Sequence, residues 1–524
     1  MSEFIYFSGR MPVYAQNVVA TSQPLAVQTG LNILRQGGNA IDAAIATAIT
    51  LTVVEPTSNG LGSDAFAMVF KDNELSGING SGRSPAAWSY DQFSKRDKMP
   101  TTGWQTVTTP GAVSVWVELS KRFGNLSFKD LFKDAIQYAR EGFIVSPITA
   151  QAWQKAEQRY TDFEEFKRIF LPNGIAPKVG ERFKNEDQAR TLEAIANSGG
   201  NDFYQGKLAA QIAKAAANDN AHLTEQDLLN HNVDWVKPLA IDYYGVTLHE
   251  LPPNGQGLAA LLTLGMLQEC DINQYPLDSV DSLHVQIEAM KMAFHAVETY
   301  LADPDWMSIT NEDLLRPESI KLNAAKIKMH RASELPYELA SDHGTVYLTT
   351  ADQDGNMVSF IQSNYMGFGS GIVIPGTGIS MQNRGHGFSL KQGHPNQIDG
   401  NKRPFHTIIP AFVTNGGQPV MSFGVMGGRM QPQGHVQMMV RIFTYQQNPQ
   451  TASDAPRWCV LEDGTVAIEP HMPESLLQGL KERGHKITTK ENQATFGGAQ
   501  LIINRGGNYI AASDHRKDGL AAGF

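Results

Sequence analysis

The residues with the clearest chemical potential lie in the segment SDHGTVYLTTADQDGN, residues 341–356, where Gly344 directly precedes Thr345. A threonine hydroxyl is a weak nucleophile unless a base lies beside it. If the peptide bond between these residues were cut, the new α-amino group of Thr345 would supply that base, since such a group titrates near ~8. The segment therefore predicts a precursor chain in which Thr345 becomes an N-terminal residue.

The same two residues suggest how the cut would be made. Gly344 has no side chain, so the backbone can bend and the Thr345 hydroxyl can reach the carbonyl carbon of Gly344. An N→O acyl shift followed by hydrolysis would then free Thr345. Taken alone, a Gly–Thr pair is more typical of an ordinary strand start, so this hypothesis depends on the rest of the chain.

The elements that must position Thr345 follow from periodicity. Alternating residues predict strands at 345–351 and 357–363, joined by a hairpin turn at 354–356. Asn39 is placed to cap a helix at 40–54 that is apolar nearly all round. Further helices are predicted at 24–36, 127–141, 187–197, 281–301 and 433–446, and further strands at 75–79, 371–374, 408–414 and 419–423.

The composition excludes several classes of protein. The chain has 524 residues, 41% apolar and 18% charged, which is ordinary for a globular protein with a large core. Its net charge of −10 disfavours nucleic acid or a membrane surface as a partner, because both select basic patches. The apolar stretch at 43–54 is too short to span a bilayer. The first residues lack the pattern of a signal peptide, so we expect a cytoplasmic protein.

The cysteines and histidines form no recognisable metal or redox motif. Cys270 and Cys459 lie far apart without a CxxC spacing, which favours free thiols. Four histidines between residues 386 and 435 fit no known zinc spacing. We therefore expect neither a metal nor another cofactor.

Eight segments, in chain order, resemble the γ-glutamyltransferase family. They are 37–70 (GGNAIDAAIATAITLTVVEPTSNGLGSDAFAMVF), 108–113 (TTPGAV), 252–257 (PPNGQG), 284–294 (HVQIEAMKMAF), 349–359 (TTADQDGNMVS), 368–373 (FGSGIV), 402–410 (KRPFHTIIP) and 426–437 (MGGRMQPQGHVQ). The resemblance implies an α/β (α+β) N-terminal-nucleophile hydrolase with a four-layer αββα sandwich. It also implies cleavage between Gly344 and Thr345. The large subunit, 1–344, and the small subunit, 345–524, would remain one intertwined domain, a heterodimer whose higher oligomeric state is left open.

The resemblance also assigns roles to individual residues. Gly427 and Gly428 match the glycine pair whose N–H groups form the oxyanion hole, and their place before a helix start suits that role. Ser363 matches a threonine that hydrogen-bonds near the nucleophile and its amine. Arg83 and Thr407 match residues that hold a substrate carboxylate. Without the family context, Arg83 would be a solvated loop arginine and the glycine pair a simple strand-to-helix turn, while Ser363 would fit a plain turn contact equally well.

Four positions depart from the γ-glutamyl-specific pattern. His406 replaces a serine, and it is either a larger wall residue that can carry charge or a core histidine satisfied by the backbone. Gly387 and Arg384 stand where the family has an aspartate and an acidic or amide residue, and Tyr365 replaces an asparagine. An ammonium beside Arg384 without a carboxylate partner would be poorly stabilised. This pattern resembles the acylase-like and small-amide-hydrolysing branches.

Three functions stay open at this level. The first is hydrolysis or transfer of a γ-glutamyl group, as from glutathione. The second is hydrolysis of a carboxylate-bearing amide that lacks the α-amino group, such as a glutaryl or oxamate-like amide. The third, from a different class, is a silent relative that only binds a small molecule. In the first two, a small-molecule amide is the partner and Thr345 attacks its carbonyl carbon.

Overall fold

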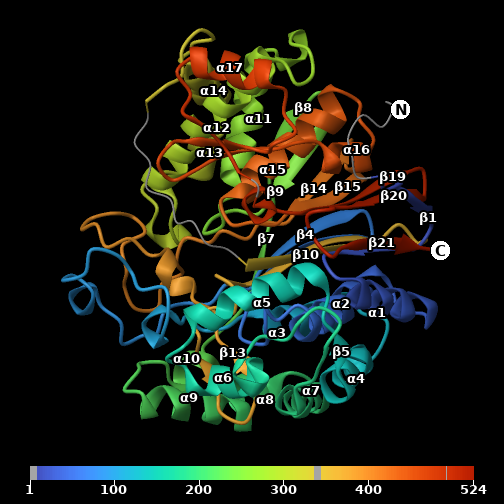
Figure 1. The fold of residues 1–524 in the computed structure, drawn as a ribbon, viewed down its shortest axis with the longest axis vertical. Helices are drawn as coiled ribbons and strands as arrows, with labels where there is room; N and C mark the ends of the chain where they lie inside the picture. Colours follow the sequence, from blue (N-terminus) through green and yellow to red (C-terminus); the bar gives the residue numbers. More distant parts are fainter. Residues whose placement is uncertain (1–8, 335–343, 491) are drawn as a thin grey trace.

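Two seven-stranded antiparallel sheets lie between two layers of helices in the computed structural model, which describes residues 9–334, 344–490 and 492–524 (Figure 1). The β10 sheet has the order β21 (Leu520–Gly523), β2 (Val18–Thr21), β10 (Gly344–Ala351), β11 (Met357–Tyr365), β3 (Asp64–Lys71), β4 (Glu74–Asn79) and β7 (Asp234–Val236). The β15 sheet has the order β1 (Val13–Ala15), β20 (Asn508–Ser513), β19 (Ala499–Arg505), β15 (Gln418–Val425), β14 (Ala411–Asn415), β9 (Val246–Glu250) and β8 (Leu239–Tyr243).

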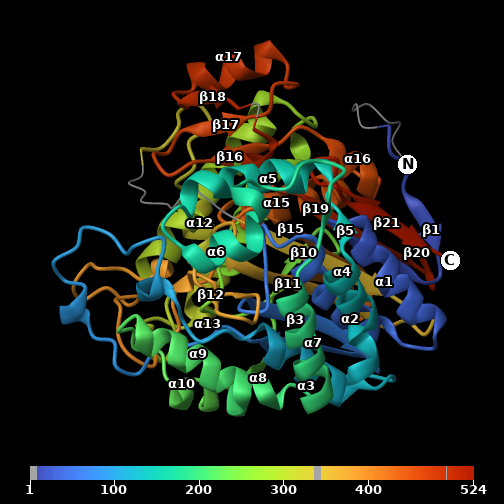
Figure 2. The ribbon, with the colours of Figure 1, turned by 60° about the horizontal axis from the view of Figure 1, so that its bottom comes forward.

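The alternation of side chains along the strands produces this layering. In β3, the odd-numbered apolar residues pack into a core with one helix layer, whereas the even-numbered ones pack into a core between the two sheets. The helix layer on the β10 sheet, which Figure 2 brings forward, contains α1 (Pro24–Arg35), α2 (Ala40–Val54), α3 (Ala112–Phe123), α4 (Lys133–Glu141), α5 (Pro147–Arg159), α7 (Glu186–Ser198) and α9 (Lys207–Asn218). The layer on the β15 sheet contains α11 (Leu258–Glu269), α12 (Val280–Tyr300), α14 (Pro317–Ala324), α15 (Met430–Met439) and α17 (Glu474–Glu482). The fold is therefore the four-layer αββα sandwich.

A β-bulge marks the beginning of β10. Gly344 pairs with Tyr365 and Val346 pairs with Gln362, so two residues of β11 lie opposite the single residue Thr345. Because Val346 packs toward the helices and Tyr347 toward the other sheet, alternation turns Thr345 to the space between the sheets. Bulges of this kind re-aim side chains near functional sites.

Most of the predicted elements are present, with shifted ends. The capped helix at 40–54 is confirmed, since the Asn39 side chain accepts hydrogen bonds from the N–H groups of Ile41 and Asp42. The helix predicted at 127–141 is instead a 3₁₀ turn, Phe128–Phe132, followed by α4. The helix predicted at 433–446 begins earlier, at Met430, and ends in a π-turn, Val440–Thr444.

Two further expectations concern the thiols and the membrane. Both cysteines are free thiols, as predicted. In the described parts of the chain, no helix combines the length and apolarity needed to cross a bilayer.

Both sheets contain strands from before and after the predicted cut. In the β10 sheet, β10 pairs on one side with β2 and on the other with β11. In the β15 sheet, β14 pairs with β9, from the earlier part of the chain, and with β15, from the later part. The hydrogen bonds of both sheets therefore cross between the two predicted subunits.

A cut between Gly344 and Thr345 should consequently leave one particle. We expect two polypeptides on a denaturing gel but an elution volume in size-exclusion chromatography that matches the uncut Thr345→Ala variant. Native separation into pieces of residues 1–344 and 345–524 would contradict this prediction.

Candidate active site

One hydroxyl connects the two residues of the predicted scissile bond. The Ser363 hydroxyl donates to the carbonyl oxygen of Gly344 at 2.6 Å and accepts from the N–H of Tyr365 at 2.7 Å. The hydroxyl of Thr345, a residue only 3% exposed, donates to the Ser363 oxygen at 3.4 Å. A serine hydroxyl has one proton and two lone pairs, and all three are used here. The Gly344 carbonyl is therefore polarised while the Thr345 hydroxyl is held next to it.

Only glycine fits at position 344. A Cβ atom there would lie 2.9 Å from the nitrogen of Gly367 and 3.0 Å from the carbonyl oxygen of Thr57. Both neighbours are backbone atoms, which cannot rotate away as a flexible side chain would. The glycine thus lets the chain before Thr345 pass between two backbone segments.

The predicted oxyanion glycines lie between β15 and α15. Gly427 and Gly428 have φ values of 114° and 57°, a region that favours glycine. Within the described residues, neither N–H group donates a hydrogen bond. The Gln256 amide donates to the carbonyl oxygens of Gly428, at 2.8 Å, and Thr407, at 2.6 Å, and so fixes the turn. Two oriented and unused N–H groups can stabilise a developing oxyanion.

The beginning of β10 and the end of β15 lie together. Gly424 packs directly on the ring of Tyr347, because a Cβ on Gly424 would lie 2.4 Å from that ring. Tyr347 is two residues after Thr345, and Gly424 is three residues before Gly427. The sheet packing therefore brings the predicted nucleophile and the predicted oxyanion glycines to the same end of the sandwich.

A buried carboxylate, which the sequence reasoning missed, lies at the start of β3. Asp64 pairs in register with Ser363, the residue that contacts Thr345. One Asp64 oxygen accepts from the N–H groups of Gly111, at 3.0 Å, and Gly82, at 3.4 Å. The other accepts from Nε2 of His406 at 3.1 Å. The only sequence signal was an acid within a glycine-rich loop that precedes an apolar strand.

His406 is held as a neutral side chain. Its Nδ1 accepts from the N–H of Ile408 at 3.4 Å, so its proton lies on Nε2, toward Asp64. Burial and the nearby Arg384 hold the pKa of His406 well below its usual range. The charged His406 that the sequence allowed is therefore wrong. The structure agrees better with the alternative of a core histidine, although the hydrogen bonds of His406 involve Asp64 as well as the backbone.

Arg384 is a buried cation next to this pair. Arg384 is only 1% exposed. Burial lowers the pKa of its guanidinium group to about 10, which leaves the group charged at neutral pH. Nη1 donates to the Thr407 hydroxyl at 2.9 Å, and Cζ lies 4.7 Å from the centre of the Tyr365 ring. Within the described residues, Nε and Nη2 have no hydrogen-bond partner.

Arg83 lies in a different setting. Its side chain is 40% exposed and donates to Asp303 at 2.7 Å and to the carbonyl oxygen of Asn401 at 3.1 Å. In the described structure no hydrogen bond joins Arg83 to Thr407, whose hydroxyl binds Arg384 instead. Joint binding of a carboxylate by Arg83 and Thr407 stays a prediction.

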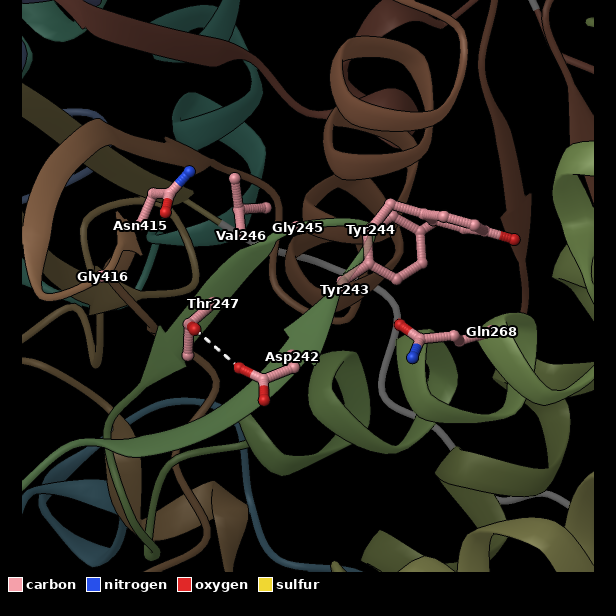
Figure 3. Close-up of a pocket in the computed structure, with 9 residues that line it drawn as sticks. All are labelled: Asp242, Tyr243, Tyr244, Gly245, Val246, Thr247, Gln268, Asn415 and Gly416. Atoms are coloured by element: carbon pink, nitrogen blue, oxygen red, sulfur yellow. Dashed lines mark hydrogen bonds between the residues drawn. The ribbon is translucent and has the colours of Figure 1, made fainter.

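Two hollows in the described part of the chain contain none of the predicted site residues. The first, about 440 Å³, lies where the β8–β9 turn, α11 and the β14–β15 turn meet, and Figure 3 shows the Thr247 hydroxyl donating to Asp242 at 2.7 Å at its edge. The second, about 320 Å³, is mainly apolar and is lined by the beginning of α1, by α4 and by the segment 142–146. The described residues also contain no cluster of three or more potential metal ligands.

An αββα sandwich in which a Gly–Thr pair begins a central strand, with two N–H groups at the same end that donate no hydrogen bond within the described residues, defines an N-terminal-nucleophile hydrolase. The gamma-glutamyltranspeptidase family model matches residues 26–524, and the chain belongs to that family.

Named relatives agree with this assignment. The chain is 35% identical over 519 residues to the glutathione hydrolase-like YwrD proenzyme of Bacillus subtilis, covering 97% of this chain and 98% of the relative. It is 32% identical over 515 residues to the oxamate amidohydrolase proenzyme of Klebsiella pneumoniae, covering 95% and 97%. The crystal structure of cephalosporin acylase from Bacillus halodurans has a TM-score of 0.93 and 45% identity, covering 100% of this chain and 99% of that one. The protein is thus an amide hydrolase of the self-cleaving proenzyme type.

The buried Asp64 predicts a pH-dependent stability. Burial raises its pKa from 3.8 to about 7, so the folded state holds the proton more tightly than the unfolded chain does. The stability contributed by the protonated form is therefore present at low pH and lost as pH rises toward 7. Between pH 5 and pH 8, Asp64→Asn should gain about 2 kcal/mol in unfolding free energy relative to the parent chain.

Urea denaturation at both pH values, in an uncut Thr345→Ala background, measures this difference. Asp91→Asn, at an exposed carboxylate, is the matched control and should show no such gain. If the difference in unfolding free energy between the Asp64→Asn variant and its parent stays constant across this pH range, burial does not raise the pKa of Asp64.

Proposed function

We propose that Thr345 is the nucleophile both of self-cleavage and of amide hydrolysis. The observation that carries this proposal is the Ser363 hydroxyl, which donates to the Gly344 carbonyl at 2.6 Å and accepts from the Thr345 hydroxyl at 3.4 Å. A hydrogen bond to a carbonyl oxygen stabilises the negative charge that develops there when its carbon is attacked. The electrophile and the attacking group are thus aligned by one side chain.

Self-cleavage proceeds in two balanced steps. The Thr345 oxygen attacks the Gly344 carbonyl carbon, the C–N bond breaks, and the hydroxyl proton passes to the nitrogen. This gives an ester between Gly344 and the Thr345 side chain and a free α-amino group. Water then hydrolyses the ester, which leaves a carboxylate on Gly344 and regenerates the Thr345 hydroxyl.

Substrate turnover reuses the regenerated hydroxyl. The α-amino group of Thr345 takes the hydroxyl proton as the oxygen attacks the substrate amide, and then gives it to the leaving amine. The unused N–H groups of Gly427 and Gly428 stabilise the oxyanion. Water, or an acceptor amine, then removes the acyl group from Thr345. Turnover therefore needs a donor set different from that of self-cleavage, which uses Ser363.

Family membership leaves the acyl group undetermined. The relatives and neighbours are named for glutathione, oxamate and cephalosporin. The active form that we propose consists of residues 1–344 and 345–524, and its substrate is a small-molecule amide. A relative that only binds a ligand would need neither the Ser363 arrangement nor the unused glycine N–H groups.

Loss of the Ser363 hydroxyl should slow self-cleavage. Ser363→Ala removes the donor to the Gly344 carbonyl, and we expect the half-time of cleavage to increase about 100-fold. Ser363→Thr keeps a hydroxyl and should stay within about tenfold of the parent. The ratio of uncut to cut chain on a denaturing gel over time measures both rates. Equal rates for the alanine and threonine variants would remove Ser363 from the mechanism.

Distortion of the glycine pair should separate the two reactions. Gly427→Ala places a Cβ 3.1 Å from the Cα of Gly497 at a φ of 114°, so the turn must shift. We expect kcat for amide hydrolysis to fall about 100-fold while self-cleavage changes only a few-fold, because Ser363 serves the latter. Thermal unfolding checks that the variant is folded. A parallel loss of both reactions would contradict separate donor sets.

A further inference from the structure

Arg384 has an unused edge that is shaped for a carboxylate. Its Nη1 is bound to the Thr407 hydroxyl, whereas Nε and Nη2 have no partner within the described residues. These two nitrogens lie along one edge of the planar guanidinium group, and their N–H bonds point in parallel. A carboxylate accepts two parallel hydrogen bonds from such a pair. Buried donors without an acceptor are costly, so this edge points to a ligand.

The surrounding residues hold that edge in place. The Tyr365 ring stacks on the guanidinium at 4.7 Å, and Tyr365 has a φ of 81°, which is unusual for a residue with a side chain. Non-glycine residues in this region are strained, and such strain is concentrated at functional sites. The Thr407 hydroxyl holds the opposite edge at 2.9 Å. The guanidinium is thus fixed in orientation before any ligand arrives.

The edge is connected by short contacts to the reacting groups. Tyr365 lies opposite Gly344 in the β10–β11 pair, and its N–H donates to Ser363. On the other side, the Gln256 amide joins the carbonyl oxygen of Thr407 to that of Gly428. One chain of contacts, through Tyr365, therefore joins Arg384 to the predicted scissile bond, and another, through Thr407 and Gln256, joins it to the proposed oxyanion site.

Beside Arg384, an α-ammonium group would have to share a carboxylate that is already hydrogen-bonded. Both oxygens of Asp64 already accept hydrogen bonds, from His406 and from two backbone N–H groups. An acid at position 387 has no room, because a Cβ on Gly387 would lie 2.5 Å from the carbonyl oxygen of Phe405. A cation next to Arg384 would also meet like-charge repulsion.

We propose that Arg384, braced by Tyr365 and Thr407, binds a carboxylate on the acyl group and so determines which acyl groups the site accepts. This proposal rests on Thr345 being the nucleophile. It assigns the carboxylate to Arg384 rather than to Arg83, which is half-exposed and already paired with Asp303.

Four p-nitroanilides test this assignment: succinyl, glutaryl, γ-glutamyl and butyryl. The γ-glutamyl compound differs from the glutaryl compound by its α-amino group, and the butyryl compound lacks the carboxylate. We expect kcat/KM for the better of the two dicarboxylic anilides to exceed that for butyryl about 100-fold and that for γ-glutamyl at least tenfold, as about 3 kcal/mol from a charge-assisted pair would give.

Two variants identify the residue responsible. Arg384→Gln keeps an amide donor but removes the charge and the parallel edge, and it should reduce the preference for the dicarboxylic over the butyryl anilide about 100-fold, mainly through KM. Arg83→Gln is the matched control and should change that preference less than tenfold. Self-cleavage and thermal unfolding show that each variant is folded. Inhibition by glutarate should weaken in parallel for Arg384→Gln only.

The outcomes separate this proposal from the proposed function. A chain that cleaves itself and hydrolyses any anilide supports Thr345 as the nucleophile. If its preference is for γ-glutamyl or butyryl, or if Arg83→Gln rather than Arg384→Gln removes the dicarboxylic preference, the Arg384 site is wrong. A chain that neither cuts itself nor releases p-nitroaniline overturns both proposals.

Discussion

The hydrogen bond from Ser363 to the Gly344 carbonyl is the constraint on which the site depends. It requires β10 to begin at Gly344, with the bulge in β11 opposite Thr345, and a glycine between two backbone segments. The bulge and the glycine both reduce the free energy of unfolding, because a bulge interrupts the hydrogen bonds of the sheet and glycine loses more conformational entropy than other residues. Together they place a carbonyl carbon within reach of a hydroxyl. The proposed reaction therefore explains this local structure more directly than stability does.

The site also contains more buried charge than stability alone would favour. Asp64 and Arg384 are almost fully buried, and their desolvation is repaid only in part by hydrogen bonds and by mutual attraction. Both oxygens of Asp64 accept hydrogen bonds, whereas two nitrogens of Arg384 donate none within the described residues, so the imbalance is one of unused donors rather than of net charge. The guanidinium of Arg384 therefore loses its hydration water when the chain folds, not when a ligand binds. A ligand carboxylate then meets a guanidinium that has little water to lose and little freedom to give up.

The sequence predicted the elements around Thr345 well because their signals are local. The hairpin of β10 and β11, the capped helix α2 and the glycine turn before α15 each depend on neighbouring residues. Contacts between residues far apart in the chain were not predictable in the same way. Asp64 meets His406 across 342 positions, and Arg83 meets Asp303 across 220, so only the packed sheets bring them together. The resemblance to the family pointed to His406 and Arg384. The neutral state of His406 and the unpaired edge of Arg384 depend on how the folded protein surrounds them, which the sequence does not show.

Because both sheets contain strands from both halves, a cut between them changes how the structure can form again after unfolding. Before it, the covalent link keeps the halves at a high effective concentration, and folding is a unimolecular event. Afterwards the same structure would have to form from two separate chains, so its equilibrium stability depends on dilution. We expect the cut molecule to persist because its opening is slow, not because reassembly is easy. If the chain is cut as we propose, it folds only once as a single chain, and the unfolding rate of the cut form sets its active lifetime.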